Sequence, residues 1–363
     1  MSEISEAPST PGSPGTPPAT PAAPPAAKNR AGLTKADYRG APSTLCVGCG
    51  HDSITNHIIT SFYELGVEPY QVAKMSGIGC SSKTPAYFMS QAHGFNSVHG
   101  RMPSVSTGAK IANRTLNMIA VSGDGDTASI GLGQFCHLIR RNLDMVYIVE
   151  NNGVYGLTKG QFSATADKDS KLKYGAVNQF EQIDICELAI MMGCSYVARS
   201  FSGDPKQLVP LIKGAVSHQG TAIIDCISPC VTFNNHEGSS RSYLAVKAKD
   251  TPIHEIGYVE AQPEIKVDYA PGTVQEVVFA DGSIVTLKKL KKDYDPTNKL
   301  AALTLIEESK RDGTMLTGLF YVNTHNKDLT GMLTLPQKPL AQFTENDLRP
   351  SAEALQKVMK GFA

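Results

Sequence analysis

The sequence lacks the features that define several large classes of protein. Its 34 basic and 34 acidic side chains leave a formal net charge of zero, so it has no excess of Lys and Arg with which to hold a nucleic acid. No stretch approaches the roughly 18 consecutive apolar residues that span a bilayer. The N-terminus has no basic start followed by an apolar segment, which a secretory signal requires. We therefore expect a cytoplasmic protein that binds neither nucleic acid nor membrane.

Cysteine is sparse, with eight residues in a chain of 363. That number is too small for a disulfide scaffold, and in a chain without a secretory signal the spacing of Cys residues indicates metal or redox chemistry first. Hydrophobic residues make up 41% of the sequence, which is enough for a sizeable core. The length predicts about two domains.

The N-terminal segment has a composition that cannot form a core. Residues 1–27 contain eight of the 22 Pro, separated by Ala, Ser, Thr and Gly. We predict a disordered Pro/Ala-rich tail over residues 1–33, to which no function is assigned. The rest is predicted to divide into a main domain over 34–250 and a C-terminal extension over 251–363.

The C-terminal extension has the pattern of a small α+β unit. Residues 274–290 contain two β-prone runs around Asp281-Gly282, a dipeptide typical of a hairpin turn. Residues 296–312 have the apolar spacing of a helix. We interpret this part as an extension of the main domain rather than as a second catalytic domain.

The main domain has an alternating pattern of strands and helices. Buried strands are predicted over 116–121 and 145–149, with a helix over 127–141 between them. Short links make this a βαβ unit with parallel strands. The pattern also predicts strands at 195–198 and 222–227 and helices at 54–64 and 205–217. These elements predict an α/β fold with a doubly wound, mostly parallel sheet.

Polar residues follow both strands of the βαβ unit. Gly123-Asp124-Gly125-Asp126 follows the first strand, and Asn151-Asn152-Gly153 follows the second. Both segments should lie at the carboxyl edge of the sheet, where open α/β sheets bind ligands. The glycines would allow close approach of a diphosphate, and the helix N-terminus favours its negative charge.

This edge also offers the oxygen ligands that Mg²⁺ prefers. Asp124 can supply a carboxylate oxygen, Asn152 an amide oxygen and Val154 a backbone carbonyl. Gly-Asp-Gly alone also fits an ordinary strand-to-helix turn, but the Asn pair one helix later favours the metal site. The segment resembles the signature of thiamine-diphosphate enzymes.

A second set of candidate ligands consists of cysteines. Cys46 and Cys49 form a C-x-x-C motif, and Cys80 and Cys230 lie in distant segments. Four such thiolates could hold one [4Fe–4S] cluster or a Cys₄ zinc, and the spacing alone leaves both alternatives open. The other four cysteines lie in helix or strand patterns and are predicted to be small buried hydrophobes: Cys136, Cys186, Cys194 and Cys226.

The combination of the two sets resembles the β subunit of the 2-oxoacid:ferredoxin oxidoreductases. The resemblance covers about residues 40–250 closely and the C-terminal part more loosely. The segments that carry it are CVGCGH (46–51), GIGCSSK (77–83), HGR (99–101), GDGDTASIG (123–131), ENNGVYGLTKGQ (150–161) and SPC (228–230). The GLTKGQ sequence and the length look like the 2-oxoglutarate branch.

The resemblance implies an activity and a set of cofactors. The activity is the oxidative decarboxylation of 2-oxoglutarate to succinyl-CoA and CO₂, with electrons passed through the cluster to ferredoxin, and in reverse the fixation of CO₂. The implied cofactors are thiamine diphosphate, Mg²⁺ and one [4Fe–4S] cluster. The alternatives are the same class of enzyme acting on pyruvate, a branched-chain or an aryl 2-oxoacid, or a non-catalytic scaffold with a Cys₄ zinc.

The resemblance also implies partner molecules. Thiamine enzymes need a carboxylate near the aminopyrimidine, and the sequence shows no second thiamine-type region that would provide it. In the family this Glu comes from an α subunit, so we expect a dimer of αβ heterodimers. Ferredoxin, CoA and the 2-oxoacid are the other expected partners.

Site residues follow from the resemblance position by position. Cys46, Cys49, Cys80 and Cys230 would hold the cluster, and Asp124, Asn152 and Val154 would hold Mg²⁺. The expected cofactor contacts are Gly50, His51, Gly79, Cys80, Ser81, Lys83, His99, Gly123, Asp124, Gly125, Asp126, Asn152, Val154, Tyr155, Gly156, Leu157 and Thr158.

Three residues are candidates for the reaction itself, namely His51, Leu157 and Lys159. His51 stands where pyruvate-type relatives have a carboxylate, and we expect it to lie near the cofactor. Lys83 and Lys159 could hold a dicarboxylate substrate or the phosphates of CoA. The alternative is that both lysines are solvated surface residues.

Overall fold

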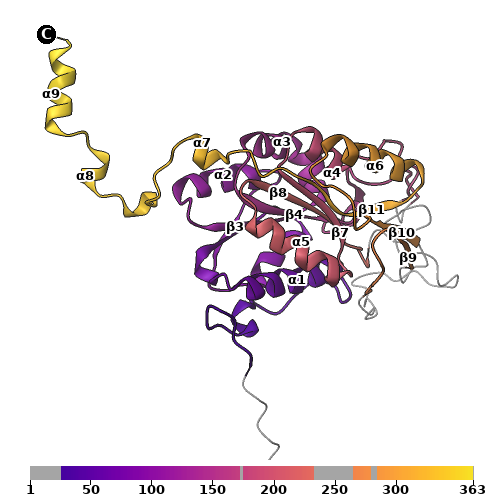
Figure 1. The fold of residues 1–363 in the computed structure, drawn as a ribbon. Helices are drawn as coiled ribbons and strands as arrows, with labels where there is room; N and C mark the ends of the chain where they lie inside the picture. Colours follow the sequence, from indigo (N-terminus) through magenta and orange to yellow (C-terminus); the bar gives the residue numbers. More distant parts are fainter. Residues whose placement is uncertain (1–25, 172–174, 233–264, 279–283, 363) are drawn as a thin grey trace, which may run out of the picture.

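The computed structural model describes residues 26–171, 175–232, 265–278 and 284–362 (Figure 1). Most of the predicted tail lies outside these ranges. Its last residues are attached to the body, because the Asn29 side chain donates hydrogen bonds to the Tyr38 hydroxyl and the Tyr63 carbonyl, both at 2.8 Å.

The centre of the fold is a nine-stranded sheet with the order β2-β1-β3-β4-β8-β7-β11-β10-β9. The first six strands in this order are parallel to one another, which confirms the predicted doubly wound α/β class. The strands are β1 (Val72–Ser76), β2 (His93–Asn96), β3 (Asn117–Gly123), β4 (Met145–Asn151), β7 (Tyr196–Phe201), β8 (Thr221–Ile227), β9 (Val274–Val278), β10 (Ile284–Lys289) and β11 (Met315–Val322).

Helices cover both faces of this sheet (Figure 1). One face carries α1 (Gly50–Leu65) and α5 (Pro205–Ser217), and the other carries α2 (Met102–Ala112), α3 (Leu132–Arg141), α4 (Ile185–Met191) and α6 (Lys299–Arg311). Two apolar cores result, one on each side of the sheet. Every residue of β4 and β8 is buried, as expected for parallel strands covered on both faces.

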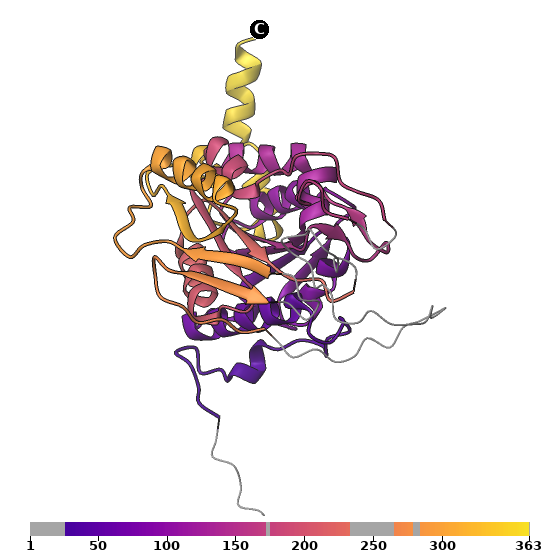
Figure 2. The same cartoon turned by 90° about the vertical axis from the view of Figure 1, so that its right-hand side faces the viewer.

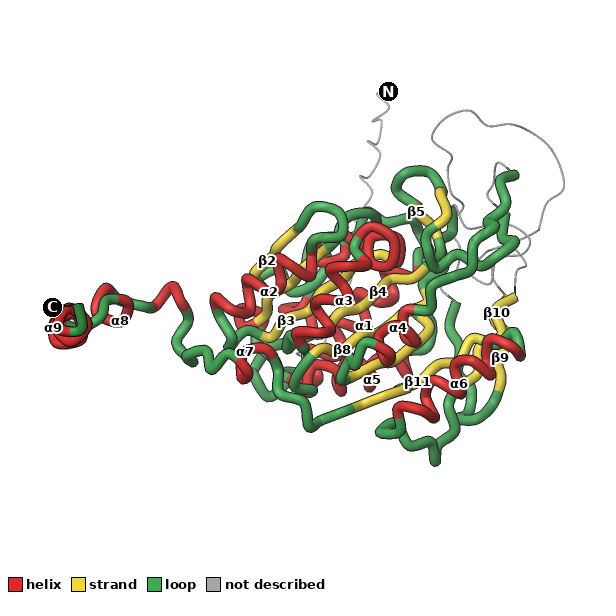
Figure 3. The backbone as a smooth tube through the Cα atoms, turned by 90° about the horizontal axis from the view of Figure 1, so that it is seen from above, coloured by secondary structure: helices red, strands yellow, loops and turns green. Residues whose placement is uncertain are grey.

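The segment between β3 and β4 differs from the predicted single helix over 127–141. A π-helical turn (Gly125–Ile130) comes first, and α3 begins only at Leu132. The break has a cause outside the turn, because other segments anchor the Asp126 side chain. The Asp126 carbonyl accepts a hydrogen bond from Gly131 N at 2.9 Å. A second, two-stranded sheet of β5 (Val154–Tyr155) and β6 (Gln161–Phe162) follows β4 (Figure 3).

The C-terminal part continues the main sheet. β11 pairs antiparallel with β7 and parallel with β10, and β9 and β10 form the predicted antiparallel pair. The predicted turn at Asp281-Gly282 lies outside the described residues. The predicted helix over 296–312 is observed as α6.

Beyond α7 (Leu329–Met332) the chain leaves the body. The helices α8 (Glu345–Leu348) and α9 (Ala352–Lys360) form an arm that extends away from it (Figures 1 and 2). None of the helices in the described ranges is long and apolar enough to cross a membrane.

Candidate functional site

A cavity opens at the carboxyl edge of the sheet, where β3 and β4 end. Its lining is drawn from segments that are far apart in the sequence but that all lie after parallel strands or at helix starts. The lining residues are His51, Ile78, Gly79, Cys80, Ser81, His99, Gly123, Asp124, Gly125, Asp126, Glu150, Asn152, Val154, Tyr155, Gly156, Leu157 and Thr158. The structure thus gathers most of the predicted cofactor contacts around one space, and Ile78 and Glu150 are additions to the predicted set.

The two side chains predicted to bind Mg²⁺, Asp124 and Asn152, lie side by side in this cavity. The Asp124 carboxylate accepts a hydrogen bond from the backbone N–H of Asn152 at 3.3 Å and from the Thr165 hydroxyl at 2.7 Å. The Ser163 hydroxyl donates to the same oxygen as Thr165. The Asn152 side-chain oxygen accepts from the Val154 N–H at 3.1 Å. The acidic and amide groups therefore share one rim of the sheet.

The cavity has the features that a diphosphate and its cation need. Among the described residues, the Ser81 hydroxyl and the Glu150 Oε1 are buried without a hydrogen-bond partner, and both residues line the cavity. A Cβ built on Gly79 would meet open space. A carboxylate, an amide oxygen and a carbonyl make a set of hard oxygen donors. These residues fit thiamine diphosphate with Mg²⁺.

Asp126 lines the same cavity, but its carboxylate is already fully engaged within the protein. One oxygen accepts from His99 Nδ1 at 2.6 Å and from the Gly100 N–H at 2.9 Å. The other accepts from the Ser122 hydroxyl at 2.9 Å and the Ile78 N–H at 3.2 Å. Asp126 therefore ties three segments together and shapes the cavity.

A buried polar pair forms another part of the lining. His51 Nε2 lies 3.6 Å from the Glu150 carboxylate, and His51 Nδ1 lies 2.5 Å from the Ser228 hydroxyl. Burial lowers the pKa of His51 to about 4, so the imidazole is neutral at pH 7. Burial also raises the pKa of Glu150 well above its usual value. The sequence could have indicated Glu150 as a residue of the cavity, because it is the acidic residue that ends the apolar run MVYIVE.

The four predicted cluster cysteines come together beside the cavity. Cys46 and Cys49 precede α1, Cys80 begins the 3₁₀ turn Cys80–Ser82, and Cys230 follows β8. Burial and, to a smaller extent, the charges on Cys230 and Cys46 raise the pKa of Cys80 to about 11. The Cys230 charge also raises the pKa of Cys49, after the larger effect of burial. The four thiols are therefore close enough to act on one another.

The four thiols supply the type of ligand that a [4Fe–4S] cluster or a Zn²⁺ ion requires. All four thiols are free rather than paired in disulfides. This donor set fits an iron–sulfur cluster.

Three of the four remaining cysteines belong to the core as predicted, and the prediction is wrong for Cys136. Cys186, Cys194 and Cys226 are buried among apolar side chains, and Cys136 on α3 is partly exposed. The sulfur of Cys186 donates a weak hydrogen bond to the Ala198 carbonyl at 3.5 Å.

Two predicted cofactor contacts, Gly50 and Lys83, and the predicted reaction residue Lys159 lie outside the cavity lining. Gly50 packs so tightly against the chain after β8 that a Cβ would come within 2.6 Å of the Ser228 hydroxyl. Lys83 closes the turn that begins at Cys80 and is partly buried. Lys159 is exposed in the turn between β5 and β6, with a φ of 75°. A left-handed backbone conformation is uncommon for Lys, and here it occurs in the tight turn that connects β5 to β6.

A known family model matches the middle of the chain. Residues 77–226 correspond to the family described as "Thiamine pyrophosphate enzyme, C-terminal TPP binding domain". These residues include the ends of β3 and β4 and most of the cavity lining.

The chain is also similar to curated proteins whose names describe subunits of enzymes that act on 2-oxoacids. It is 44% identical over 191 residues to the "2-oxoacid:ferredoxin oxidoreductase subunit beta" of Sulfolobus sp, which covers 52% of this chain and 63% of that protein. It is 36% identical over 228 residues to the "2-oxoglutarate synthase subunit KorB" of Methanothermobacter marburgensis, which covers 61% and 79%. The chain spans 60–63% of the length of the relatives that it matches at 42–44% identity.

One solved structure is similar over almost its whole length. It is titled "2-oxoglutarate:ferredoxin oxidoreductase from Magnetococcus marinus with 2-oxoglutarate, coenzyme A and succinyl-CoA bound". The TM-score is 0.68 at 26% identity, and the match covers 91% of this chain and 96% of that chain. The similarity therefore includes the C-terminal part as well as the main domain.

Proposed function

Because this chain belongs to the family of 2-oxoacid:ferredoxin oxidoreductase beta subunits, we propose that it forms the cofactor-binding half of an enzyme that oxidatively decarboxylates 2-oxoglutarate. The products are succinyl-CoA, CO₂ and reduced ferredoxin. The observation that carries the proposal is one cavity lined by Asp124, Asn152 and Cys80. A diphosphate–metal anchor and a cluster ligand therefore face the same space.

In this proposal the edge of the sheet holds Mg²⁺ and the diphosphate. Asp124, the side chain of Asn152 and the carbonyl of Val154 would coordinate the ion. The neighbouring hydrogen bond from Asn152 N–H to Asp124 keeps these groups together before the ion binds. The unpartnered Ser81 hydroxyl supplies a donor that faces the cavity.

The protein's other task is to place an electron acceptor beside the reacting carbon. Bound thiamine diphosphate supplies a carbanion-stabilising ring for decarboxylation, and a [4Fe–4S] cluster takes up electrons. Cys46, Cys49, Cys80 and Cys230 would hold the cluster as thiolates, which requires the loss of their protons on binding. His51 is neutral and hydrogen-bonded, so it lines the cavity without adding charge.

The name "beta subunit" among the relatives supports an α subunit as partner. We propose that this partner supplies the Glu that faces the aminopyrimidine, and that two αβ heterodimers assemble. Exposed apolar side chains near the cavity give the partner a surface to cover, with Leu157 and Ile130 both 53% exposed. Ferredoxin, CoA and a cytoplasmic location complete the proposal, and strongly reducing ferredoxin would drive the reaction towards CO₂ fixation.

The choice of 2-oxoglutarate is supported by the relatives named 2-oxoglutarate synthase and by the structure with 2-oxoglutarate bound. Within this chain, we propose that Lys159 meets the distal carboxylate of the substrate. Its exposed position in the turn above the cavity leaves the ammonium free to reach a ligand.

A panel of 2-oxoacids tests both the activity and the role of Lys159. The αβ complex is assayed anaerobically with CoA and a viologen acceptor on 2-oxoglutarate, pyruvate, a branched-chain and an aryl 2-oxoacid. We expect 2-oxoglutarate to give the highest kcat/KM. Lys159→Ala should lower kcat/KM for 2-oxoglutarate by about tenfold or more, the value of one charge-assisted hydrogen bond, with a smaller effect on pyruvate.

Lys213→Ala is the matched control, because Lys213 lies on α5 and pairs with Glu64 on the surface. This variant should have the same kcat/KM as the wild type for each of the 2-oxoacids. An equal loss on 2-oxoglutarate and pyruvate in Lys159→Ala would remove the specificity role. No turnover of any 2-oxoacid by the complex would contradict the proposed activity.

A further inference from the structure

A network of polar side chains extends from the cavity into the interior of the protein. Asn151 precedes the proposed ligand Asn152, but its own side chain lies behind the cavity. Its Nδ2 donates to Asp225 Oδ1 at 2.8 Å, and its Oδ1 lies 3.0 Å from the Thr165 hydroxyl. The same hydroxyl lies 2.7 Å from Asp124 Oδ2. Thr165 therefore lies between Asn151 and the proposed metal-binding carboxylate, and its single hydroxyl hydrogen is shared between these two oxygen acceptors.

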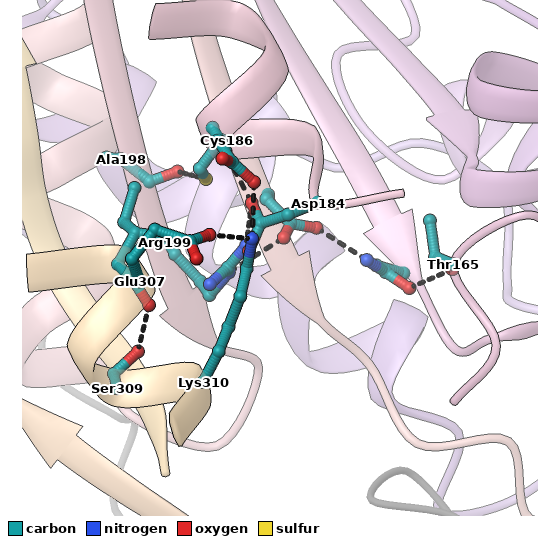
Figure 4. Close-up of polar contacts among 12 residues, drawn as sticks. Thr165, Asp184, Cys186, Ala198, Arg199, Glu307, Ser309 and Lys310 are labelled. Atoms are coloured by element: carbon teal, nitrogen blue, oxygen red, sulfur yellow. Dashed lines mark hydrogen bonds and ion pairs between the residues drawn. The ribbon is translucent and has the colours of Figure 1, made fainter. Parts of the chain in front are cut away.

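The member of this network farthest from the cavity is a buried arginine. Arg199 on β7 donates from Nε to Asp225 Oδ2 at 2.8 Å and from Nη2 to Asp184 Oδ1 at 2.7 Å (Figure 4). Arg199 is 4% exposed and Asp225 is 1% exposed. The Asp184 side chain also caps α4 by accepting from the Glu187 N–H at 3.0 Å. The guanidinium is thus almost entirely buried and is fixed at two points.

The C-terminal part meets the main domain at this arginine. The Arg199 guanidinium lies over the Phe320 ring of β11, with 5.6 Å to the ring centroid. Lys310 on α6 pairs with Glu187 on α4. The C-terminal part therefore packs against Arg199 directly and is joined through Glu187 to the helix that Asp184 caps.

The stability of the fold alone does not explain why Arg199 and its two carboxylate partners are buried. Burying charges costs several kcal/mol per ion, and an ion pair often does no better than apolar residues of the same volume. A hydrogen-bonded network does fix the orientation of each member, because every donor has one partner to satisfy. In this chain the Asn151 amide must turn its NH₂ towards Asp225, which leaves its oxygen facing Thr165.

We propose that Arg199 is a positioning residue for the metal site: acting through Asp225, Asn151 and Thr165, it holds the Asp124 carboxylate in the orientation that binds the cation of the diphosphate. The inference rests on the proposed function, since it assigns Asp124 to that cation. Partners of this kind around a ligating carboxylate typically contribute 10–100-fold to metal affinity.

The test measures metal binding rather than turnover. Mn²⁺ is titrated into the αβ complex freed of metal, with thiamine diphosphate present, and free Mn²⁺ is followed by EPR. Thr165→Val removes the hydroxyl at nearly constant volume and should weaken Mn²⁺ binding about 10-fold or more. Arg199→Lys keeps the charge but loses the two-point contact, and it should weaken binding in the same direction.

The double variant separates positioning from general destabilisation. If Arg199 acts through Thr165, then Arg199→Lys should add little to the loss already caused by Thr165→Val. If Arg199→Lys does not fold, Asp225→Asn breaks the same link and should show the same non-additivity. Thr221→Val is the matched control, because its buried hydroxyl donates to the Leu143 carbonyl at the other end of β8; it should bind Mn²⁺ as the wild type does.

The outcomes distinguish this inference from the proposed function. Unchanged Mn²⁺ affinity in Thr165→Val, or fully additive losses in the double variant, would overturn the positioning role. Asp124→Ala is measured alongside these variants. If it too binds Mn²⁺ like the wild type, then the metal site itself is misplaced and the proposed function fails; if it alone loses binding, only the positioning inference fails.

Discussion

Replacing Asp124 by Ala should abolish metal-dependent binding of thiamine diphosphate and reduce turnover of the αβ complex by about a thousandfold or more. The carboxylate is the one charged ligand in the proposed Mg²⁺ set, and the diphosphate depends on the ion to neutralise its charge. A thousandfold loss corresponds to about 4 kcal/mol, which is in the range expected when a metal loses an anionic ligand. Isothermal titration of thiamine diphosphate with Mg²⁺ measures the loss directly.

Asp126 lies two residues away and provides the comparison, because its carboxylate accepts hydrogen bonds that join β3 and the segments after β1 and β2. Asp126→Asn should act mainly on folding, lowering the free energy of unfolding by about 1–3 kcal/mol through hydrogen bonds that an amide cannot accept. Asp124→Ala should leave the fold intact by circular dichroism. Binding of the cofactor by Asp124→Ala with wild-type affinity would disprove the assigned metal ligand.

Replacing Cys80 by Ser should remove the iron–sulfur cluster. Cys80 lines the cavity and is within electrostatic reach of Cys230 and Cys46, so its loss leaves three thiolates where the cubane needs four. We expect about four iron and four acid-labile sulfide per chain in the wild type purified anaerobically, and a large loss of both in the variant. Reduction of ferredoxin should fall with the iron content.

Cys136→Ser is the control for this experiment, because Cys136 lies on α3 and is partly exposed. It should retain the full iron content. One zinc per wild-type chain in place of iron would favour the non-catalytic scaffold, and iron loss in Cys136→Ser would show that the ligand set is misassigned.

The sequence was sufficient to predict the part of the fold that is determined locally. Continuous apolar runs become buried strands, as in β4 and β8, and the Gly-Asp-Gly and Asn-Asn segments must meet once their strands are parallel neighbours. The contact between Asp124 and Asn152 follows from that topology. Most of the cavity lining could therefore be named in advance.

The remainder depends on pairings between distant segments. Nothing in residues 315–322 shows that β11 inserts between β7 and β10, because register and neighbour are chosen by the whole sheet. In the sequence Arg199 is only a charged residue next to an apolar run. Its role depends on two carboxylate partners, Asp184 and Asp225, that the fold brings beside it. The break between the π-helical turn and α3 also has a distant cause, since the hydrogen bonds to Asp126 come from other segments.

Reduction of the cluster by the substrate tests the central claim most directly. The αβ complex is prepared anaerobically with its iron–sulfur clusters oxidised, 2-oxoglutarate and CoA are added, and the cluster is followed by its visible absorbance and by EPR. If the cavity and the four cysteines form one electron-transfer unit, the cluster is reduced only when thiamine diphosphate and Mg²⁺ are present, and not in Asp124→Ala. A cluster that stays oxidised in the complete mixture, or that is reduced without thiamine diphosphate, would contradict the account.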